Sequence, residues 1–278
     1  MTTFTAGLVQ LTSGTEIATN LETAAQMVRE AAGRGADLVL TPENTPILDP
    51  DHDRLRQVVP GPDGHPAVQG FAEIARTLGI WVLMGSTAVK LDEDRLANRS
   101  YLFAPDGTIA ASYDKIHMFD VDIPDGQSYF ESKRFRPGEQ AVLADLPWAK
   151  LGLSICYDLR FPALYRSLAQ AGAQVLAVPA AFTQFTGQAH WHTLLRARAI
   201  ETGCFVLAPA QCGEHAQGRR TYGHSLAVAP WGEILADGGA EPGVTLVEVD
   251  TAKVDEARGM VSAITQDRDF AGPVTANS

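Results

Sequence analysis

The chain has 278 residues, of which 45% are hydrophobic and 20% charged, and its net charge is −11. This length is ample for one continuous core, and the composition is that of an ordinary globular protein, which excludes disordered, collagen-like and coiled-coil chains. The acidic balance, without a basic run, argues against nucleic acid or an anionic membrane as a partner.

The cysteines and the N-terminal segment bear on where the protein works. Three cysteines are too few, and odd in number, for a disulfide framework, so a reducing compartment is expected. The first residues, MTTFTAGLVQLTSG, lack the pattern of a signal peptide, and no apolar run approaches the ~18 residues of a membrane span. We therefore expect a cytoplasmic protein.

Short apolar runs alternate with amphipathic stretches along the first half of the chain, which predicts an α/β fold. Helices are expected at 20–33, with Asn20 as N-cap and Gly33 or Gly35 as the stop, and at 67–78. The expected strands of this half are 5–11, 37–41, 80–88, 98–104 and 108–113. The segment 44–60 after the second strand is expected to form part of a substrate rim.

The second half repeats the alternation after a long polar loop at about 120–140. Helices are expected at 162–171, 188–202 and 254–259, the first opening on a proline whose missing N–H costs nothing there. The expected strands are 142–146, 151–156, 175–178, 205–210, 225–229, 233–236 and 244–249. No linker rich in Pro, Gly or Ser divides the chain, so one domain spanning 1–278 is expected.

Two segments of the halves resemble each other. GADLVLTPE at 35–43 is echoed by GAQVLAVPA at 172–180, and each is followed by a helix and then a strand that begins with glycine. Two similar βαβ halves would place two sheets face to face with helices outside. The alternative is a chance likeness between ordinary strand-to-helix joints.

Cys156 ends an apolar run in LGLSICYDLRFP, and a helix is expected about six residues later. Backbone N–H groups and the helix dipole at such a joint lower a thiol pKa and can bind an oxyanion, as a nucleophile requires. The alternative is a buried structural cysteine, the commoner fate of a strand cysteine.

Two ionisable residues follow other expected strands. Glu43, in LVLTPEN, could act as a general base if partly desolvated, because desolvation raises a carboxyl pKa. Lys115, in SYDKIHMFDVD, could stabilise an oxyanion. Taken singly, each is better explained as an ordinary solvent-exposed residue.

Together the blocks TPE, YDKIHMFDVD, FESKRFRPGE and LGLSICYDLRFPALYR resemble, in order and spacing, the signature blocks of the nitrilase-like (carbon–nitrogen hydrolase) family. GQAHWHTLLRARAIETGCF and YGHSLAVAPWGE extend this resemblance over about 4–270. It implies a four-layer αββα sandwich of two mixed sheets with helices outside, usually assembled as a homodimer. No cofactor and no metal are implied.

The resemblance also assigns roles to residues. It implies a Glu43–Lys115–Cys156 triad, a further active-site glutamate at Glu131, and an oxyanion donor in the backbone N–H of Tyr157. Within the family, SYFES, CYDLRFPALYR and HWHTLLRARAIE look closest to amidases acting on deaminated glutathione, and next to omega-amidases of 2-oxo-acid amides. The expected activity is thus hydrolysis of a small carboxylate-bearing amide through a thioester, with water as the second substrate.

Arg160, four residues after Cys156, offers a planar fork that suits a substrate carboxylate. A structural ion pair with a loop aspartate is the alternative. Phe182 and Thr186 match pocket residues of the same relatives but could equally serve packing. The histidines of the His-Trp-His at 190–192 point apart on a helix, which argues against a shared metal ion.

Three other functions remain as alternatives. A nitrilase or an N-carbamoyl hydrolase would use the same chemistry. A catalytically silent binding protein on this scaffold would not need the four matched residues.

Cys204 is expected in the core, and Cys212 in a loop as a thiol near the pocket.

Overall fold

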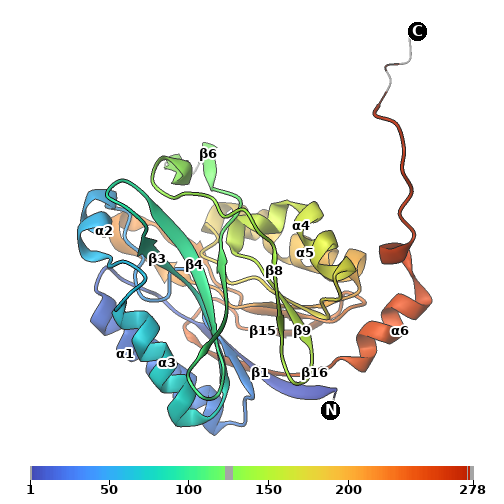
Figure 1. Ribbon diagram of the computed structural model, residues 1–278, viewed down its shortest axis with the longest axis horizontal. Helices are drawn as coiled ribbons and strands as arrows, with labels where there is room; N and C mark the ends of the chain where they lie inside the picture. The colour runs from blue at the N-terminus through green and yellow to red at the C-terminus, as the bar shows by residue number, and fades with distance from the viewer. Residues whose placement is uncertain (1, 123–127, 274, 276–278) are drawn as a thin grey trace.

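Two six-stranded sheets form the centre of the protein in the computed structural model, which describes residues 2–122, 128–273 and 275 (Figure 1). The first sheet has the order β16-β1-β2-β3-β4-β5 and the second β15-β14-β11-β10-β9-β8. The first comprises β1 (Thr3–Gln10), β2 (Leu38–Leu40), β3 (Trp81–Lys90), β4 (Leu96–Phe103), β5 (Ile109–Asp114) and β16 (Gly243–Asp250). The second comprises β8 (Val142–Asp145), β9 (Lys150–Leu153), β10 (Val175–Ala177), β11 (Phe205–Ala208), β14 (Leu226–Val228) and β15 (Ile234–Asp237).

The two sheets have the same internal plan. In each, three central strands run parallel and are joined through helices, β1-β2-β3 in one and β9-β10-β11 in the other. In the first sheet, antiparallel β16 flanks β1, and antiparallel β4 and β5 follow β3. In the second sheet, β8 flanks β9 in the same way, and β14 and β15 follow β11. The echo between 35–43 and 172–180 therefore reflects equivalent strand-to-helix units.

Helices cover the outer faces, which completes the expected four layers (Figure 1). Helices α1 (Ile17–Gly33) and α3 (Pro66–Leu78) pack on the first sheet, while α4 (Pro162–Gln170) and α5 (Gln184–Thr202) pack on the second. The inner core joins the sheets through buried side chains such as Leu40, Leu83, Leu151 and Leu153. Helix α6 (Ala252–Met260) lies at one end of the sandwich.

Several local expectations were wrong at their boundaries. Helix α1 begins at Ile17 after Glu16, so Asn20 lies inside the helix, where its side chain bonds to Gly14 and to the Pro46 carbonyl. Helix α5 begins four residues earlier than expected because Thr183 caps it, its hydroxyl accepting from the Thr186 N–H. Strand β9 stops at Leu153 instead of reaching Cys156.

Segments expected to be loops contain short elements. Helix α2 (His52–Val58) lies within 44–60, capped by the Asp51 side chain. The 120–140 loop contains β6 (Asp120–Asp122), β7 (Ser128–Phe130) and a 3-10 turn at Glu131–Lys133, and its residues 123–127 lie outside the described part of the chain. A small hairpin of β12 (Cys212–Glu214) and β13 (Arg220–Tyr222) was also not predicted.

No helix in the described part of the chain is both long and apolar enough to cross a lipid bilayer.

Candidate active site

Cys156 lies on a sharp turn that follows β9. Its φ of 47° is in the left-handed region that non-glycine residues rarely adopt, and its N–H donates to the Pro179 carbonyl at 2.9 Å. A 3-10 turn, Cys156–Arg160, begins at the cysteine and leads into α4. Strained backbone of this kind is common at functional sites, where the surrounding structure holds it.

Asp158 holds this turn, a role that the sequence reasoning missed. Its fully buried carboxylate accepts the Ile155 N–H at 2.8 Å and the Tyr113 hydroxyl at 2.7 Å. It also accepts the His117 N–H at 3.0 Å. Because Tyr113 lies on β5 and His117 in the segment after it, Asp158 fixes the turn at Cys156 to the strand that leads to Lys115. An aspartate two residues after the cysteine was the only signal in the sequence.

Glu43, Lys115 and Glu131 form one buried charged cluster. Lys115 Nζ lies 3.0 Å from Glu43 Oε1 and 2.8 Å from Glu131 Oε2. Glu43 Oε2 accepts the Ala181 N–H at 2.9 Å, and Glu131 Oε2 accepts the Phe119 N–H at 2.6 Å. Buried charges are tolerated only when paired and hydrogen-bonded, and each member of this cluster is both.

Asn98 links the two carboxylates and was also missed. Its side-chain amide donates to Glu43 Oε1 at 3.0 Å and to Glu131 Oε1 at 3.3 Å. Asn98 lies on β4, and its backbone carbonyl accepts a hydrogen bond from the Lys115 N–H. The sequence carried no sign of this role, which depends on the pairing of β4 with the segment after β5.

The charges of the cluster set the protonation of the thiol. Burial alone raises the pKa of Glu43, but the Lys115 ammonium and its hydrogen bond outweigh this, and the pKa is lowered. Burial and the neighbouring Glu43 carboxylate raise the pKa of Cys156 well above its ordinary value, against the opposing charge of Lys115. Glu43 is thus ionised beside a neutral thiol that hydrogen-bonds to it, the pairing of a general base with a nucleophile.

A cavity of about 580 Å³ opens onto this cluster. Its wall includes all four matched residues, Glu43, Lys115, Glu131 and Cys156, together with Tyr157. The remaining wall includes the aromatic rings of Phe119, Tyr129, Phe130 and Phe182, residues 47–50 of the segment after Glu43, and Thr186, Ala216, Gln217 and Arg219. Phe182, Thr186 and part of the segment 44–60 therefore line the cavity, and their contact with substrate stays a prediction.

Arg160 is not among the residues that line this cavity. Its guanidinium lies 5.2 Å from the centre of the Phe182 ring and 5.9 Å from that of Tyr157, and Nη1 lies 3.3 Å from His190 Nδ1. It thus packs against two rings of the cavity wall. The alternative, an ion pair with a loop aspartate, is not formed with any carboxylate of the described residues. Its role towards substrate remains a prediction.

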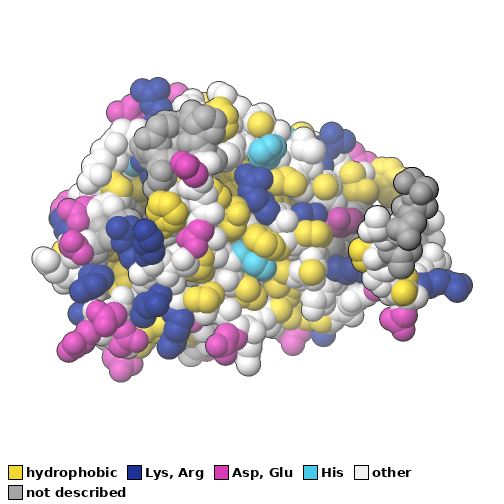
Figure 2. All heavy atoms as spheres, turned by 90° about the horizontal axis from the view of Figure 1, so that it is seen from above, with side chains coloured by type: hydrophobic (Ala, Val, Ile, Leu, Met, Phe, Trp, Pro, Cys, Tyr) yellow, Lys and Arg dark blue, Asp and Glu magenta, His cyan; other side chains and the backbone are white. Residues whose placement is uncertain are grey.

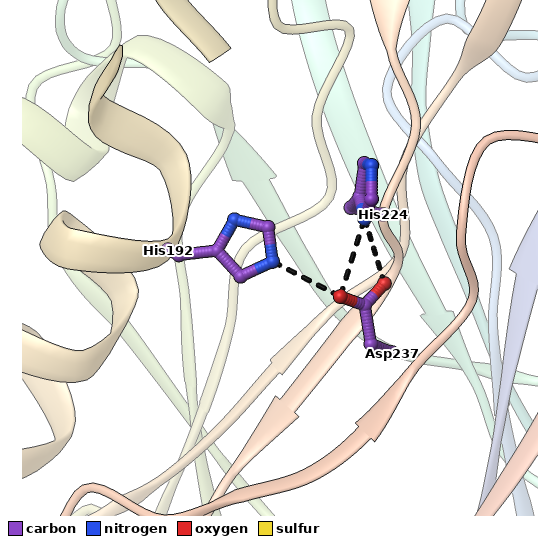
Figure 3. A group of neighbouring side chains, drawn as sticks. All are labelled: His192, His224 and Asp237. Atoms are coloured by element: carbon purple, nitrogen blue, oxygen red, sulfur yellow. Dashed lines mark hydrogen bonds and ion pairs between the residues drawn. The ribbon is translucent and has the colours of Figure 1, made fainter. Parts of the chain in front are cut away.

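Three residues outside the cavity wall could hold a metal ion. His192 Nε2 lies 3.0 Å from Asp237 Oδ2, and His224 Nδ1 lies 2.9 Å from Asp237 Oδ1 (Figure 3). The three ligand atoms lie within 4.8 Å of one another. His190 points elsewhere, as expected for its spacing from His192. The sequence missed the group because α5, the segment before β14 and strand β15 meet only in the fold, and its hydrogen bonds need no ion to form.

The other two cysteines are buried away from the cavity wall. Cys204 lies in the core, with Sγ 3.2 Å from the Ala173 carbonyl. Cys212 begins β12 instead of lying in a loop and contacts Thr12, so the expectation of a loop thiol at the pocket was wrong.

The sequence and the fold both match known proteins. Residues 5–259 match the family described as "Carbon-nitrogen hydrolase". The chain is 40% identical over 264 residues to a deaminated glutathione amidase of Yersinia enterocolitica, covering 94% of this chain and 92% of that protein. It is 36% identical over 270 residues to the human omega-amidase NIT2, covering 96% of each chain.

Solved structures agree with this likeness. The C. elegans NitFhit protein superposes with a TM-score of 0.88 at 33% identity, over 96% of this chain and 66% of that one. Saccharomyces cerevisiae Nit3, described as a member of branch 10 of the nitrilase superfamily, gives a TM-score of 0.86 at 29% identity over 95% and 96% of the chains.

Proposed function

Since the chain belongs to the carbon–nitrogen hydrolase family, we propose that it is a cysteine-dependent amidase whose reaction runs through a thioester on Cys156. The observation that carries the proposal is the buried Glu43–Lys115–Glu131 cluster beside the Cys156 thiol, at the wall of a cavity large enough for a small metabolite. Enzymes that hydrolyse C–N bonds in this way need a nucleophile, a base and a group that stabilises an oxyanion.

In the first half of the reaction, Cys156 Sγ attacks the amide carbonyl while Glu43 takes the thiol proton. Lys115 and the Tyr157 N–H stabilise the oxyanion that forms. Glu43 then gives its proton to the leaving nitrogen, the C–N bond breaks, and ammonia or an amine departs from a thioester.

In the second half, a water attacks the thioester while Glu43 accepts one of its protons. The C–S bond breaks, the acid leaves, and the proton returns to the thiol. Glu131 acts as a positioning residue, because both of its oxygens accept hydrogen bonds from the Lys115 ammonium, which Glu43 also contacts. The reaction needs no metal ion.

The charges of the cavity favour a substrate with a carboxylate. Its three acidic residues are already paired, Glu43 and Glu131 with Lys115, and Asp49 with Arg54. Its other cations, Lys133, Arg134 and Arg219, form no ion pair with a carboxylate among the described residues. In a chain of net charge −11, this local excess of positive charge favours an anionic ligand.

Deaminated glutathione is the substrate that we propose first, because it is the amide named for the Yersinia relative and it carries carboxylates. An omega-amidase acting on amides of 2-oxo dicarboxylic acids is the second candidate, after the human relative. We expect nitriles and carbamoyl compounds to be poor substrates.

We also propose that the enzyme works in the cytoplasm as a homodimer. Exposed apolar side chains gather near the β14–β15 edge of the second sheet: Ile200 on α5, and Trp231, Ile234 and Leu235 around the β14–β15 turn. Such residues suit an interface that buries apolar area. By contrast, the face seen in Figure 2 has charged side chains of both signs crowded on the side of α2. Sedimentation measurements on the wild type and on Trp231→Glu test this.

The activity itself is tested by measuring ammonia or amine release from a panel of amides, nitriles and carbamoyl compounds. We expect release from carboxylate-bearing amides above all. Turnover of nitriles at a comparable rate, or no turnover of any amide, would contradict the proposal.

A further inference from the structure

Arg219 lies beside the catalytic base but has no part in the steps above. It follows the turn between β12 and β13, in which Gln217 and Gly218 both have left-handed backbone, with φ of 56° and 74°. The His215 N–H closes this turn by donating to the Arg219 carbonyl at 2.7 Å. The turn directs the chain back so that Arg219 lines the cavity, whereas the adjacent Arg220 pairs with Glu214 at the surface.

The contacts of Arg219 place its guanidinium close to Glu43. Nη2 donates to the Ala181 carbonyl at 3.2 Å, and the N–H of the same Ala181 donates to Glu43 Oε2 at 2.9 Å. The Tyr129 ring lies on another side, its centre 5.6 Å from the guanidinium carbon. Arg219 is therefore held by one backbone carbonyl and one ring, neither of which carries a charge that neutralises it.

One donor of this guanidinium is left over. Arg219 Nε is buried and has no hydrogen-bond partner within the described residues. A buried N–H without an acceptor is unfavourable, and native proteins rarely keep one unless a ligand or water completes it. The carboxylates of the cavity wall cannot serve, since Glu43, Glu131 and Asp49 are held by Lys115 and Arg54.

We propose that Arg219 forms a carboxylate-binding subsite next to the nucleophile, which holds an anionic group of the amide substrate. The planar guanidinium fork matches a carboxylate through two parallel hydrogen bonds, which a lysine ammonium cannot reproduce. The inference rests on the proposed amidase function and deepens it, because it assigns the carboxylate preference to Arg219 in place of Arg160. The carboxylate belongs either to the acyl part or to the leaving amine, and the experiment separates the two.

The kinetic test compares charged and neutral amides of matched length on the wild type and Arg219→Lys. One arm uses glutaramate against pentanamide, with the carboxylate on the acyl part. The other uses N-butyrylglycine against N-butyrylethylamine, with the carboxylate on the amine. We expect kcat/KM to fall by about 10- to 100-fold for the charged member of one arm, as for loss of a charged hydrogen bond, and to change little for both neutral amides.

Two control variants sharpen this comparison. Arg220→Lys changes the adjacent arginine, which begins β13 and lies outside the cavity wall, and should leave all four rates unchanged. Arg160→Lys should slow charged and neutral amides alike, because Arg160 supports the Phe182 ring. An equal loss on all four amides in Arg219→Lys, or a selective loss in Arg160→Lys instead, would overturn the inference.

A binding measurement keeps the subsite testable even if no amide is turned over. Glutarate has two carboxylates and no scissile bond, so its binding to Cys156→Ala by calorimetry reports on the subsite alone. We expect the Kd to rise by about 10-fold or more when Arg219→Lys is added, the loss expected for one charged hydrogen bond. An unchanged Kd in a variant with an unchanged melting temperature would refute the subsite, while wild-type inactivity with intact glutarate binding would refute only the amidase.

Discussion

The substitution Glu131→Gln tests whether the second glutamate positions Lys115. It keeps the shape of the side chain but removes the charge that Lys115 Nζ contacts at 2.8 and 3.1 Å, and it weakens the acceptor for the Phe119 N–H. Removing one partner of a buried ion pair costs ~3–5 kcal/mol, and Gln retains an acceptor oxygen, so we expect a loss of about 3 kcal/mol. For a chain of this length, that corresponds to a fall in melting temperature of about 5 °C.

The activity of Glu131→Gln should fall by more than its loss of stability explains. With Glu131 neutral, Lys115 is held only by Glu43 and moves towards it, away from the oxyanion. We expect kcat to fall by about 100-fold, the scale of losing one oxyanion-stabilising group, with KM little changed.

Thermal unfolding and steady-state kinetics on a carboxylate-bearing amide measure both effects. Asp120→Asn is the matched control, since it removes one nearby charge whose side chain, within the described residues, accepts the exposed Ser132 N–H. It should change stability by less than about 0.5 kcal/mol. If Glu131→Gln kept wild-type kcat in a folded protein, the positioning role would be wrong.

Three other predictions concern the nucleophile, metal and pH. Cys156→Ala should abolish turnover in a folded protein, and mass spectrometry with a slow substrate should find the acyl adduct on Cys156, whereas an adduct on Cys204 or Cys212 would contradict the assignment. Activity should survive excess chelator and vanish with a thiol alkylator; loss on chelation that zinc restores would implicate a metal, with the His192–His224–Asp237 group as the first place to look. Because the pKa of Glu43 is lowered from its ordinary 4.5, its charge stabilises the fold above that value and the benefit is lost as pH falls through the lower folded pKa. The acid limb of kcat/KM should therefore lie below pH 4.5, and a limb near neutral pH would show that Glu43 is not the base.

The sequence predicted the plan of the fold better than its details. Hydrophobic periodicity and the echo between 35–43 and 172–180 suggested two similar halves, because buried parallel strands leave continuous apolar runs, but the echo alone left a chance likeness open. Helix α2 and the β12–β13 hairpin were missed, since elements this short leave no clear periodic pattern in the sequence. Asn20 was misassigned because an asparagine that suits an N-cap equally suits bonding to the Gly14 and Pro46 backbone from within the first turns of α1.

The candidate site was likewise predicted in part from the sequence. Motif blocks indicated the residues that carry charge or a thiol, and the cavity brings Glu43, Lys115, Glu131 and Cys156 together. Asn98, Asp158 and Arg219 could not be predicted, because each acts through partners far away in the sequence. For Arg219, the directing feature is the left-handed turn at Gln217 and Gly218, whose position no local pattern reveals. Proximity to the nucleophile in the sequence favoured Arg160 instead.

The duplicated plan of the sheets explains why base and nucleophile meet. Glu43 follows β2 and Cys156 follows β9, so both leave the carboxyl ends of parallel strands, the edge where α/β sheets bind ligands. The loop after β10, the counterpart of the one that carries Glu43, joins them: Pro179 accepts the Cys156 N–H, and Ala181 donates to Glu43. Gly85 permits this approach, since a side chain there would lie 2.0 Å from the Thr41 carbonyl and 2.6 Å from Pro179. One half thus supplies the proposed base and the other the proposed nucleophile, so this pair forms only when the two sheets are packed together.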